Sequence, residues 1–338
     1  MGTILGMNRV VFVLADLFAA HAGEPVSALP VADMPRIPAL EWILARAERP
    51  ALIPGADVMS GWRDWLQKEV GAEAAAGPGQ RWLATPVHYV AGLDTVRLHP
   101  DGLIVLDPEH QRFLAEDFAR VFSGSGWELR PTGGRELLLQ GPALVANAPD
   151  PARFLGLATG AGQLRGQDAA TMRRLQSEIE MWLHQHPHNR LRGASRRPVN
   201  GLWLWGCQYL NDAPSDAGAA VRARDGWLLL GDDLAARIIF TRAGGLSGSL
   251  PAGWDRELKD RGEVGSLAVI LSLAGESPVA RVQALARDWL QPALRSWRGG
   301  EFGQFEIICA DRRWLLNRTA RWKFWRRPTH WLESLLAC

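Results

Sequence analysis

Residues 184–200 hold the densest group of chemically versatile side chains in this chain of 338 residues. Three of its eight histidines fall within five residues, and asparagines and arginines accompany them. Imidazoles ligate metals or titrate near neutral pH, and the planar guanidinium fork binds phosphate or carboxylate. The segment therefore predicts a pocket for an anionic ligand at the end of a helix. The residues expected to bind the ligand are His184, His186, Asn189, Arg192 and Asn200.

The same histidines, His184, His186 and His188, are the candidates for a metal site. On a continuing helix, residues four apart share a face, so His184 and His188 would lie together and His186 would not. Pro187 breaks such a helix, and the segment lacks the carboxylate partners that a metal centre needs. Capping and packing are the alternative that we favour. Asn189 and Asn200 have a similar alternative as turn and cap residues that satisfy backbone groups.

A long helix over residues 168–185 and a strand over 202–205 frame this segment. Trp203 and Trp205 are two residues apart, so they point to one face of the strand, and we expect them to fill a core. The apolar run 10–15 predicts a buried first strand that ends just before Asp16. Because α/β folds place functional carboxylates at strand ends, Asp16 is a further ligand-binding candidate, expected to face the cleft of His186. Capping of the next turn is its alternative role.

Short apolar strands and amphipathic helices alternate along the chain, which indicates a mixed α/β fold with a mixed sheet, flanking helices and antiparallel hairpins. Residues 1–146 form an N-terminal α/β part and residues 167–338 a C-terminal one, joined by a segment rich in Pro, Gly and Ala; one continuous domain is the alternative. The expected helices are 38–47, 60–70, 108–122, 278–297 and 319–327. The expected strands are 86–90, 103–106, 127–130, 136–140, 227–230, 267–273, 304–309 and 314–317.

Long motifs in the 178–206 segment carry a resemblance to a known family. The segment reads E-I-x-M-x-L-H-x-H-P-x-N-x-x-R and then P-V-N-x-L-W-x-W-G, which resembles the RpfE-type regulatory proteins of proteobacteria. Matching pieces elsewhere are V-L-x-D-L at 13–17, L-E-W-I-L-A-R-A at 40–47, P-V-H-Y at 86–89, R-D-W-L-x-P-x-L at 287–294 and F-W-R-R-P at 324–328. The resemblance covers most of the chain and implies a regulatory protein.

That family in turn is similar to the archaeal-type cofactor-independent phosphoglycerate mutases of the alkaline-phosphatase-like superfamily. The residues of this chain that match the motif of the mutases are His186, Asn189, Arg192, Asn200 and Gly206. The mutases build a two-metal centre from an Asp-Gly pair, a serine nucleophile and a D-E-x-G-H segment. Here Leu17 follows Asp16, and no D-E-x-G-H string occurs. The resemblance therefore implies a degenerate mutase-like scaffold without an assigned catalytic residue.

The expected function is non-catalytic or regulatory binding of a phosphorylated or other anionic small molecule. The alternative is a metal-dependent, phosphoglycerate mutase-type phosphoryl transfer, for which the divalent metal would be Mn, Zn or Mg. A nucleic-acid-associated regulator is the second alternative, resting on the tail at 312–327. That tail has seven basic residues, no acid and four aromatics, a mixture that suits nucleic acid or a membrane interface. We expect instead that its aromatics dock on the sheet and its arginines stay solvated.

Composition limits the remaining function classes. The net charge is only +2, so direct nucleic-acid binding by the whole chain is not expected. Three widely spaced cysteines indicate a reducing compartment, and we expect a cytoplasmic protein. No run approaches the roughly 20 apolar residues of a membrane helix, and the interrupted N-terminal run suits a strand better than a signal peptide. Sixteen tryptophans against two tyrosines indicate a well-filled core or a stacking surface.

Overall fold

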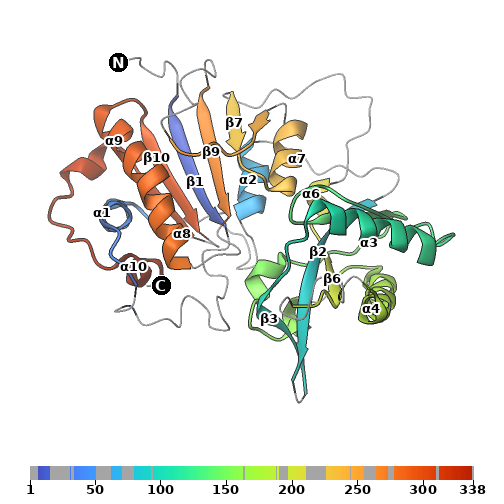
Figure 1. Cartoon of the computed structure of the whole chain (residues 1–338). Coiled ribbons are helices and arrows are strands. Elements are labelled where there is room, and N and C mark those ends of the chain that lie inside the picture. The colour runs from blue at the N-terminus through green and yellow to red at the C-terminus, as the bar shows by residue number, and fades with distance from the viewer. Residues whose placement is uncertain are drawn as a thin grey trace.

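The computed structural model describes residues 7–15, 31, 34–50, 62–70, 80–92, 94–162, 164–187, 189, 197–210, 226–243, 245–254, 264–272, 278–309 and 312–336. Two β-sheets organise these residues, with helices around them (Figure 1). The mixed α/β class expected from the sequence is confirmed. No helix among the described residues is long and apolar enough to cross a membrane.

The first sheet has six strands in the order β11-β10-β1-β9-β7-β8. All neighbours run parallel except β10 and β11, which form an antiparallel hairpin. The strand β1 lies inside the sheet, between β9 and β10, and its carboxyl end is Ala15. The bounds are Arg9–Ala15 for β1, Trp227–Leu230 for β7, Leu246–Gly248 for β8, Ser266–Ser272 for β9, Gln304–Cys309 for β10 and Arg312–Leu316 for β11.

Both faces of this sheet are buried, which explains the unbroken apolar sequence of β1. Val11 and Val13 point into one hydrophobic cluster, and Val10, Phe12 and Leu14 point into another. Alternate residues of a strand face opposite sides, so a strand covered on both sides needs apolar residues at every position. The cover of one face is α1 (Pro38–Arg46), α8 (Pro278–Leu285), the π-helical turn Ala286–Leu290, α9 (Gln291–Gly299) and α10 (Trp331–Leu336). The cover of the other face is α2 (Trp62–Val70) and α7 (Leu234–Arg242).

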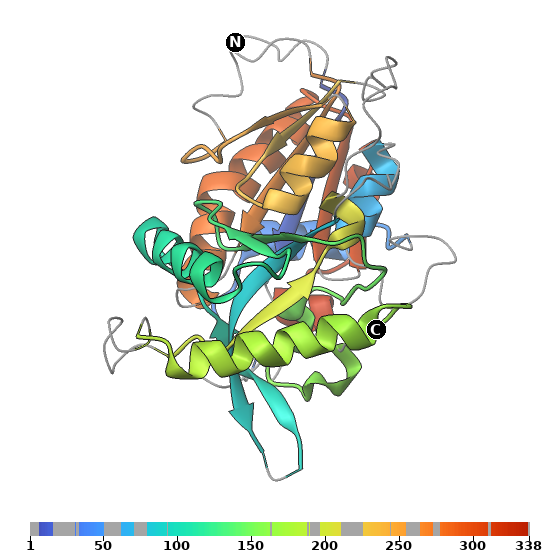
Figure 2. The same cartoon turned by 90° about the vertical axis from the view of Figure 1, so that its right-hand side faces the viewer.

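The second sheet is antiparallel and uses the long strand β2 (Gln80–Ala91) as its spine. One edge of β2 pairs with β5 (Leu137–Gly141) and β3 (Val96–Leu103), β5 pairs with β4 (Glu128–Arg130), and β6 (Gly201–Trp205) lies on the other edge of β2. Figure 2 shows α4 (Ala169–Gln185) running across β2 and β6. The remaining elements are α3 (Pro108–Val121), α6 (Cys207–Leu210) and the 3-10 turns Pro151–Phe154 and Thr159–Gly162.

Strand pairing joins segments that are distant in the sequence. The first strand β1 pairs with β9 and β10, and β6 pairs with β2. Each sheet therefore draws strands from both sides of the 147–166 connection. The domain boundary expected there stays a prediction, whereas the pairing itself is observed.

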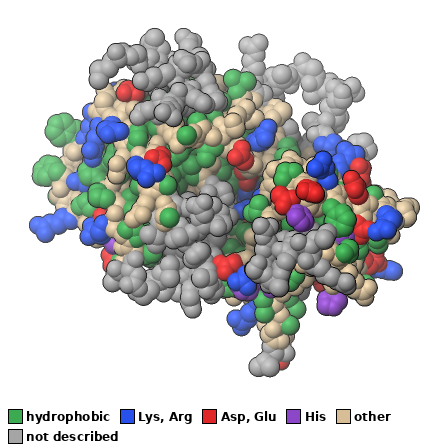
Figure 3. All heavy atoms as spheres, in the orientation of Figure 1, with side chains coloured by type: hydrophobic (Ala, Val, Ile, Leu, Met, Phe, Trp, Pro, Cys, Tyr) green, Lys and Arg blue, Asp and Glu red, His purple; other side chains and the backbone are tan. Residues whose placement is uncertain are grey.

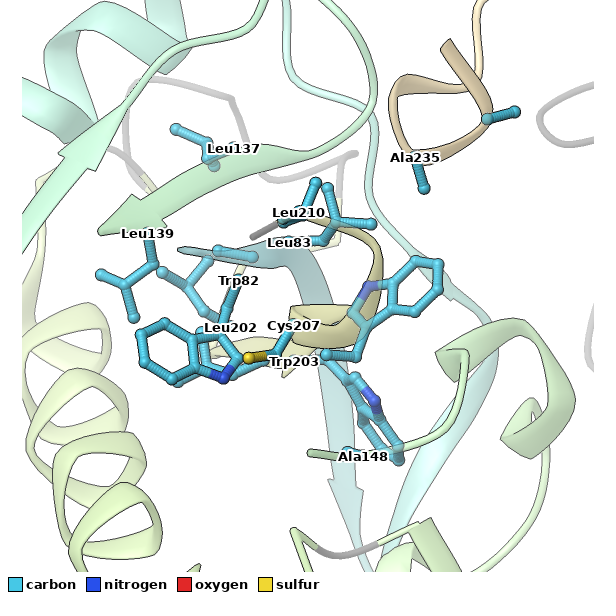
Figure 4. Packing of buried hydrophobic residues seen from close by; sticks show 14 of the residues in the cluster. Trp82, Leu83, Leu137, Leu139, Ala148, Leu202, Trp203, Cys207, Leu210 and Ala235 are labelled. Carbon is cyan, nitrogen blue, oxygen red and sulfur yellow. The ribbon is translucent and has the colours of Figure 1, made fainter. Parts of the chain in front are cut away.

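The core of the second sheet confirms the expected role of the tryptophan pair. Trp203 and Trp205 are buried on the face of β6 that carries Thr85 of β2, and the Trp205 Nε1–H donates to Thr85 Oγ1 at 2.9 Å. Trp203 Nε1–H donates to the carbonyl of Pro149 at 2.9 Å, so each indole nitrogen has a partner. Figure 4 shows Trp203 in this core, together with Leu83 of β2 and Leu137 and Leu139 of β5.

Two expectations about secondary structure are wrong. The strand expected over 103–106 is replaced by β3, which ends at Leu103 and includes Pro100, Asp101 and Gly102. The pairing of β3 with β2 shifts register between Val87 and Tyr89, and such a bulge accommodates proline and glycine at a sheet edge. The basic helix expected over 319–327 is only a 3-10 turn, Arg318–Trp322. This stretch buries only Ala320, so it has no apolar helix face to pack.

Candidate functional site

His186 lies directly after α4 and is buried against α3. Its Nε2 is 2.9 Å from Oδ2 of Asp117, and the same carboxylate oxygen accepts a hydrogen bond from Trp182 Nε1 at 2.8 Å. The imidazole meets the rings of Trp182 and Phe113 edge-on, at centroid distances of 4.9 and 5.4 Å. Burial lowers the pKa of His186, against the opposing effect of Asp117, so the imidazole is neutral at neutral pH. His186 thus has a packing role beside its predicted ligand contact.

Asn189 and Asn200 direct their amides at the backbone. Asn189 Nδ2 donates to the carbonyls of Leu183 and Val199 at 3.1 and 3.0 Å, and its Oδ1 accepts from the Val199 amide at 2.8 Å. Asn200 Oδ1 accepts from the Tyr89 amide at 2.7 Å, and its Nδ2 donates to the Tyr89 carbonyl at 2.9 Å. These bonds fasten the 186–200 connection to α4 and β2. They are the backbone role that the sequence left open for both residues.

Only one of the other predicted residues is among those described. His184 is exposed on α4, and Asp16, His188 and Arg192 lie outside the described residues. Asp16 is the next residue along the chain from Ala15, where the central strand β1 ends. Within the described part of the chain, no three His, Cys, Asp or Glu side chains are grouped so as to hold a metal ion. The convergence of the predicted residues on one pocket stays a prediction.

A buried ion cluster that the sequence did not suggest lies at the carboxyl end of β7. Arg63 of α2 donates from Nε and Nη2 to the two carboxylate oxygens of Asp233, at 3.3 and 2.5 Å, and from Nη1 to Asp150. Its guanidinium lies over two indoles, with Cζ 4.2 Å from the ring centroid of Trp62 and 4.7 Å from that of Trp205. Asp233 also caps α7, accepting from the Ala236 amide at 2.9 Å. We call this set, with Glu136 and Arg135 beside it, the Arg63 cluster.

The charges of the Arg63 cluster satisfy one another. Burial opposes charge on Arg63, but Asp233 and Asp150 hold its pKa above the ordinary value. Burial likewise opposes charge on Asp233, and Arg63 outweighs it, so the pKa of Asp233 is lowered. Burial raises the pKa of Glu136, despite the opposing attraction of Arg135. All three nitrogens of Arg63 are engaged, and the cluster joins α2, α7 and the 147–166 connection.

One signal in the sequence points toward this cluster. Gly231, Asp232 and Asp233 directly follow a four-residue apolar run, which is the same strand-end pattern that singled out Asp16. Arg63 has no such signal, because it is one polar residue of an amphipathic helix. Its partners Asp150 and Asp233 are 87 and 170 residues away in the sequence.

An open cavity of about 810 Å³ lies at the opposite, amino edge of the first sheet. It is formed where β1, β7, β9 and β10 begin, together with the end of α2 and the residues after β11. Its lining is polar except for one indole. The lining residues are Asn8, Arg9, Glu69, Trp227, Gly265, Ser266, Gly303, Gln304, Asn317 and Arg318.

Arg9 is held in this cavity by contacts with two carboxylates and two indole rings. Its Nε donates to Glu306 at 2.5 Å, and its Nη1 pairs with Glu69. Its Cζ lies 5.2 Å from the Trp227 ring centroid and 5.6 Å from that of Trp65. The third nitrogen, Nη2, is buried without a hydrogen-bond acceptor. Burial lowers the pKa of Arg9, but Glu306 and Glu69 outweigh this effect and raise it, so the group stays charged.

Among the described residues around the cavity, positive charges outnumber negative ones. Glu306 is fully buried and is shared by Arg9 and by Arg313, whose Nε is 2.7 Å away. Arg9 and Arg313 are thus balanced by Glu306 and Glu69. Arg318 is exposed at the cavity wall and adds a charge that none of these carboxylates meets. An anion bound in the cavity would neutralise this extra positive charge, whereas the Arg63 cluster has no extra positive charge for an anion to neutralise.

Comparisons with known proteins give a likeness of fold only. No family model and no curated protein matches the chain. The cofactor-independent phosphoglycerate mutase from Thermoplasma acidophilum DSM 1728 is 14% identical, with 92% of this chain and 90% of that chain covered and a TM-score of 0.34. The PH0037 protein from Pyrococcus horikoshii is 10% identical, with 93% and 90% covered and a TM-score of 0.44. We carry no site and no activity over from either.

Proposed function

We propose that this protein binds a small anionic molecule, phosphorylated or carboxylated, in the cavity at the amino edge of its first sheet. The observation that carries the proposal is the charge of the described residues that line that cavity: two of them are arginines, and the one carboxylate among them, Glu69, is already paired with Arg9. The volume lies within the range of roughly 300–1,000 Å³ that small-molecule pockets occupy.

The lining residues supply the contacts that an anion needs. Arg318 meets an entering anion from the exposed wall, and Arg9 is held in place by its carboxylates and indoles. Hydroxyl and amide groups from Asn8, Ser266 and Gln304 surround the same space, and such neutral donors fix the orientation of an oxyanion. Trp227 gives an apolar wall for the carbon part of a ligand. The role that follows is binding, and a regulatory or non-catalytic protein of the RpfE type fits it.

The test is calorimetric titration of inorganic phosphate and of 3-phosphoglycerate into the full chain, with glycerol as the uncharged probe. We expect both anions to bind and glycerol not to bind. Arg318→Ala should weaken anion binding about ten-fold, the effect of losing roughly 1.4 kcal/mol of charged hydrogen bonding. Arg327→Ala is the matched control, because Arg327 is an exposed arginine nearby in the sequence that does not line the cavity. Equal affinities of the two variants would overturn the proposal.

The 186–200 connection is the alternative place for the same ligand class. Arg197 lies there, paired with Asp101 at 3.2 Å, beside His88, whose Nδ1 is 3.0 Å from the Pro198 carbonyl. Burial lowers the pKa of His88 and of His99, and the positive charge of Arg197 acts in the same direction, so Arg197 is the cation that an anion would meet at this corner. In the same titrations Arg197→Ala distinguishes the two places, because only one of the two arginine variants should lose affinity.

A metal-dependent mutase is the alternative function that the sequence left open. The test is metal analysis of the purified protein and an enolase-coupled assay with Mn²⁺, Mg²⁺ or Zn²⁺ added. We expect no interconversion of 2- and 3-phosphoglycerate, because the sequence has neither the Asp-Gly opening nor the D-E-x-G-H segment. Turnover that His186→Ala abolishes would establish the enzyme instead.

A further inference from the structure

Three large apolar side chains stand in solvent on the segment after β11. Trp322, Phe324 and Trp325 are 74%, 77% and 65% exposed, and we call them the aromatic patch. The expectation that the aromatics of this tail dock on the sheet is wrong for these three and right for Trp314, which is buried. The rings of Phe324 and Trp325 meet edge-to-face at a centroid distance of 5.5 Å.

Three cations of this segment reach back to the protein. Lys323 Nζ pairs with Glu48 at 3.1 Å, and Arg321 Nη2 donates to the Trp297 carbonyl at 2.8 Å with its Cζ 5.2 Å from that indole's centroid. Arg326 Nη1 donates to the Ala47 carbonyl at 3.3 Å. Basic side chains thus fasten the segment to α1 and α9, and the aromatics are the groups that project.

The surface around the patch is basic. Trp42 of α1 has guanidinium groups near its ring, with Arg298 Cζ at 4.2 Å and Arg46 Cζ at 4.6 Å from the centroid, and its ring is 6.1 Å from that of Trp297. Arg327 is exposed beside the patch. No acidic residue occurs between Arg312 and Leu332, and Glu48 is already engaged by Lys323. Figure 3 shows hydrophobic side chains projecting beside Lys and Arg at the left-hand edge, where Figure 1 draws the red C-terminal segment.

We propose that the aromatic patch and its basic surround dock this protein on an anionic lipid bilayer. Indole and phenyl rings insert at the boundary between head groups and acyl chains, and guanidinium groups pair with lipid phosphates. Anionic lipid supplies the charge complementarity, and each Arg near the surface strengthens binding about five-fold. A single-stranded nucleic acid suits the geometry less well, because stacking needs ring faces along a groove, whereas these rings project and meet edge-to-face.

The test is co-sedimentation of the full chain with vesicles of phosphatidylcholine alone and of equal parts phosphatidylcholine and phosphatidylglycerol. We expect binding to the anionic vesicles that decreases as salt is added. The triple variant Trp322→Ser, Phe324→Ser, Trp325→Ser should reduce that binding at least ten-fold, and Arg327→Ala about five-fold. The matched controls are Met181→Ser and Arg112→Ala, at exposed positions of α4 and α3, and they should bind as the unmodified chain does.

Circular dichroism and the thermal midpoint should be the same for all five proteins, because every substituted side chain is exposed. Three results would overturn the proposal: no binding of the unmodified chain to anionic vesicles, equal binding to neutral ones, or unchanged binding of the triple variant. If an oligonucleotide binds more tightly than the vesicles and loses affinity with the same substitutions, nucleic acid replaces lipid as the partner.

Discussion

Arg63 and Arg9 lie at opposite ends of the strands of the first sheet, Arg63 at the carboxyl ends and Arg9 at the amino ends. Their immediate neighbours are of the same kinds. Each guanidinium lies near two indole rings and is paired with two carboxylates. The Arg63 cluster contains one more carboxylate than arginines, and the raised pKa of Glu136 allows a proton to restore the balance. The amino-edge cavity has one arginine too many, and space beside it. The enclosed Arg63 cluster can balance its charge by protonation of one of its own carboxyl groups. The open cavity needs an anionic ligand to balance its charge.

The largest expected effect is the loss of Arg63. Arg63→Met leaves Asp150 and Asp233 buried without their cation, and we expect the free energy of unfolding to fall by about 3–5 kcal/mol. Urea unfolding followed by circular dichroism measures it. A loss below about 1 kcal/mol would show that the ion pairs of Arg63 contribute little to stability.

Arg9→Met is expected to cost less, about 1.5–3 kcal/mol. Glu306 keeps Arg313 as a partner in this variant, and Glu69 is exposed enough to be hydrated. The same urea titration compares the two methionine variants directly. If Arg9→Met is the more destabilising of the two, then the amino edge, not the carboxyl edge, is the closed cluster.

Glu136 of the Arg63 cluster should make the free energy of unfolding depend on pH. Its pKa is raised in the folded state, so the folded protein binds a proton that the unfolded chain has released, and stability falls as pH rises from the ordinary pKa of 4.5 toward the raised value. Glu136→Gln should remove this fall and leave the protein more stable than the unmodified chain at pH 7. Below pH 4 the two proteins should unfold alike. A glutamine variant that is less stable at pH 7 would contradict the assignment.

His186 gives a smaller effect at mildly acidic pH. Burial lowers its pKa, so its contribution to stability is complete above the ordinary value of 6.5 and is lost as pH falls from there toward the lowered value. His186→Gln should flatten the decline of the unfolding free energy over that window. If His186 only packs against α3, the affinity for phosphate should stay unchanged in His186→Gln, and a large loss would return it to the binding site.

The sequence predicted best where burial on both sides leaves a continuous apolar run. The bounds of β7 and β10 agree with expectation, and β6 and β9 agree within one residue. The sequence predicted poorly where apolar residues are not buried in a core. The tail at 319–327 alternates basic and aromatic residues as a docking helix would, but the observed chain turns its aromatics outward. Periodicity reports which residues share a face, and it does not report what covers that face.

Site prediction had a different limit. The polar segment 184–200 was found because its residues are close together in sequence, and the backbone bonds of Asn189 and Asn200 are local contacts of the kind that sequence reasoning anticipates. The cavity at the amino edge is assembled from six separate segments, each contributing one or two residues of ordinary type. Only the parallel register of β1 with β9 and β10 brings them together.

The most direct test of the central claim is the affinity of Glu69→Gln for inorganic phosphate, measured by calorimetry. Glu69 is the one carboxylate among the described residues that line the cavity. Its removal leaves Arg9 with Glu306 alone, a carboxylate that Arg313 shares, so phosphate should bind about five-fold more tightly, a gain of roughly 1 kcal/mol. Glu116→Gln, at an exposed position of α3, makes the same change in net charge and should leave the affinity unchanged. Unchanged or weaker binding by Glu69→Gln would contradict the account, because the cavity would then not be where the anion binds.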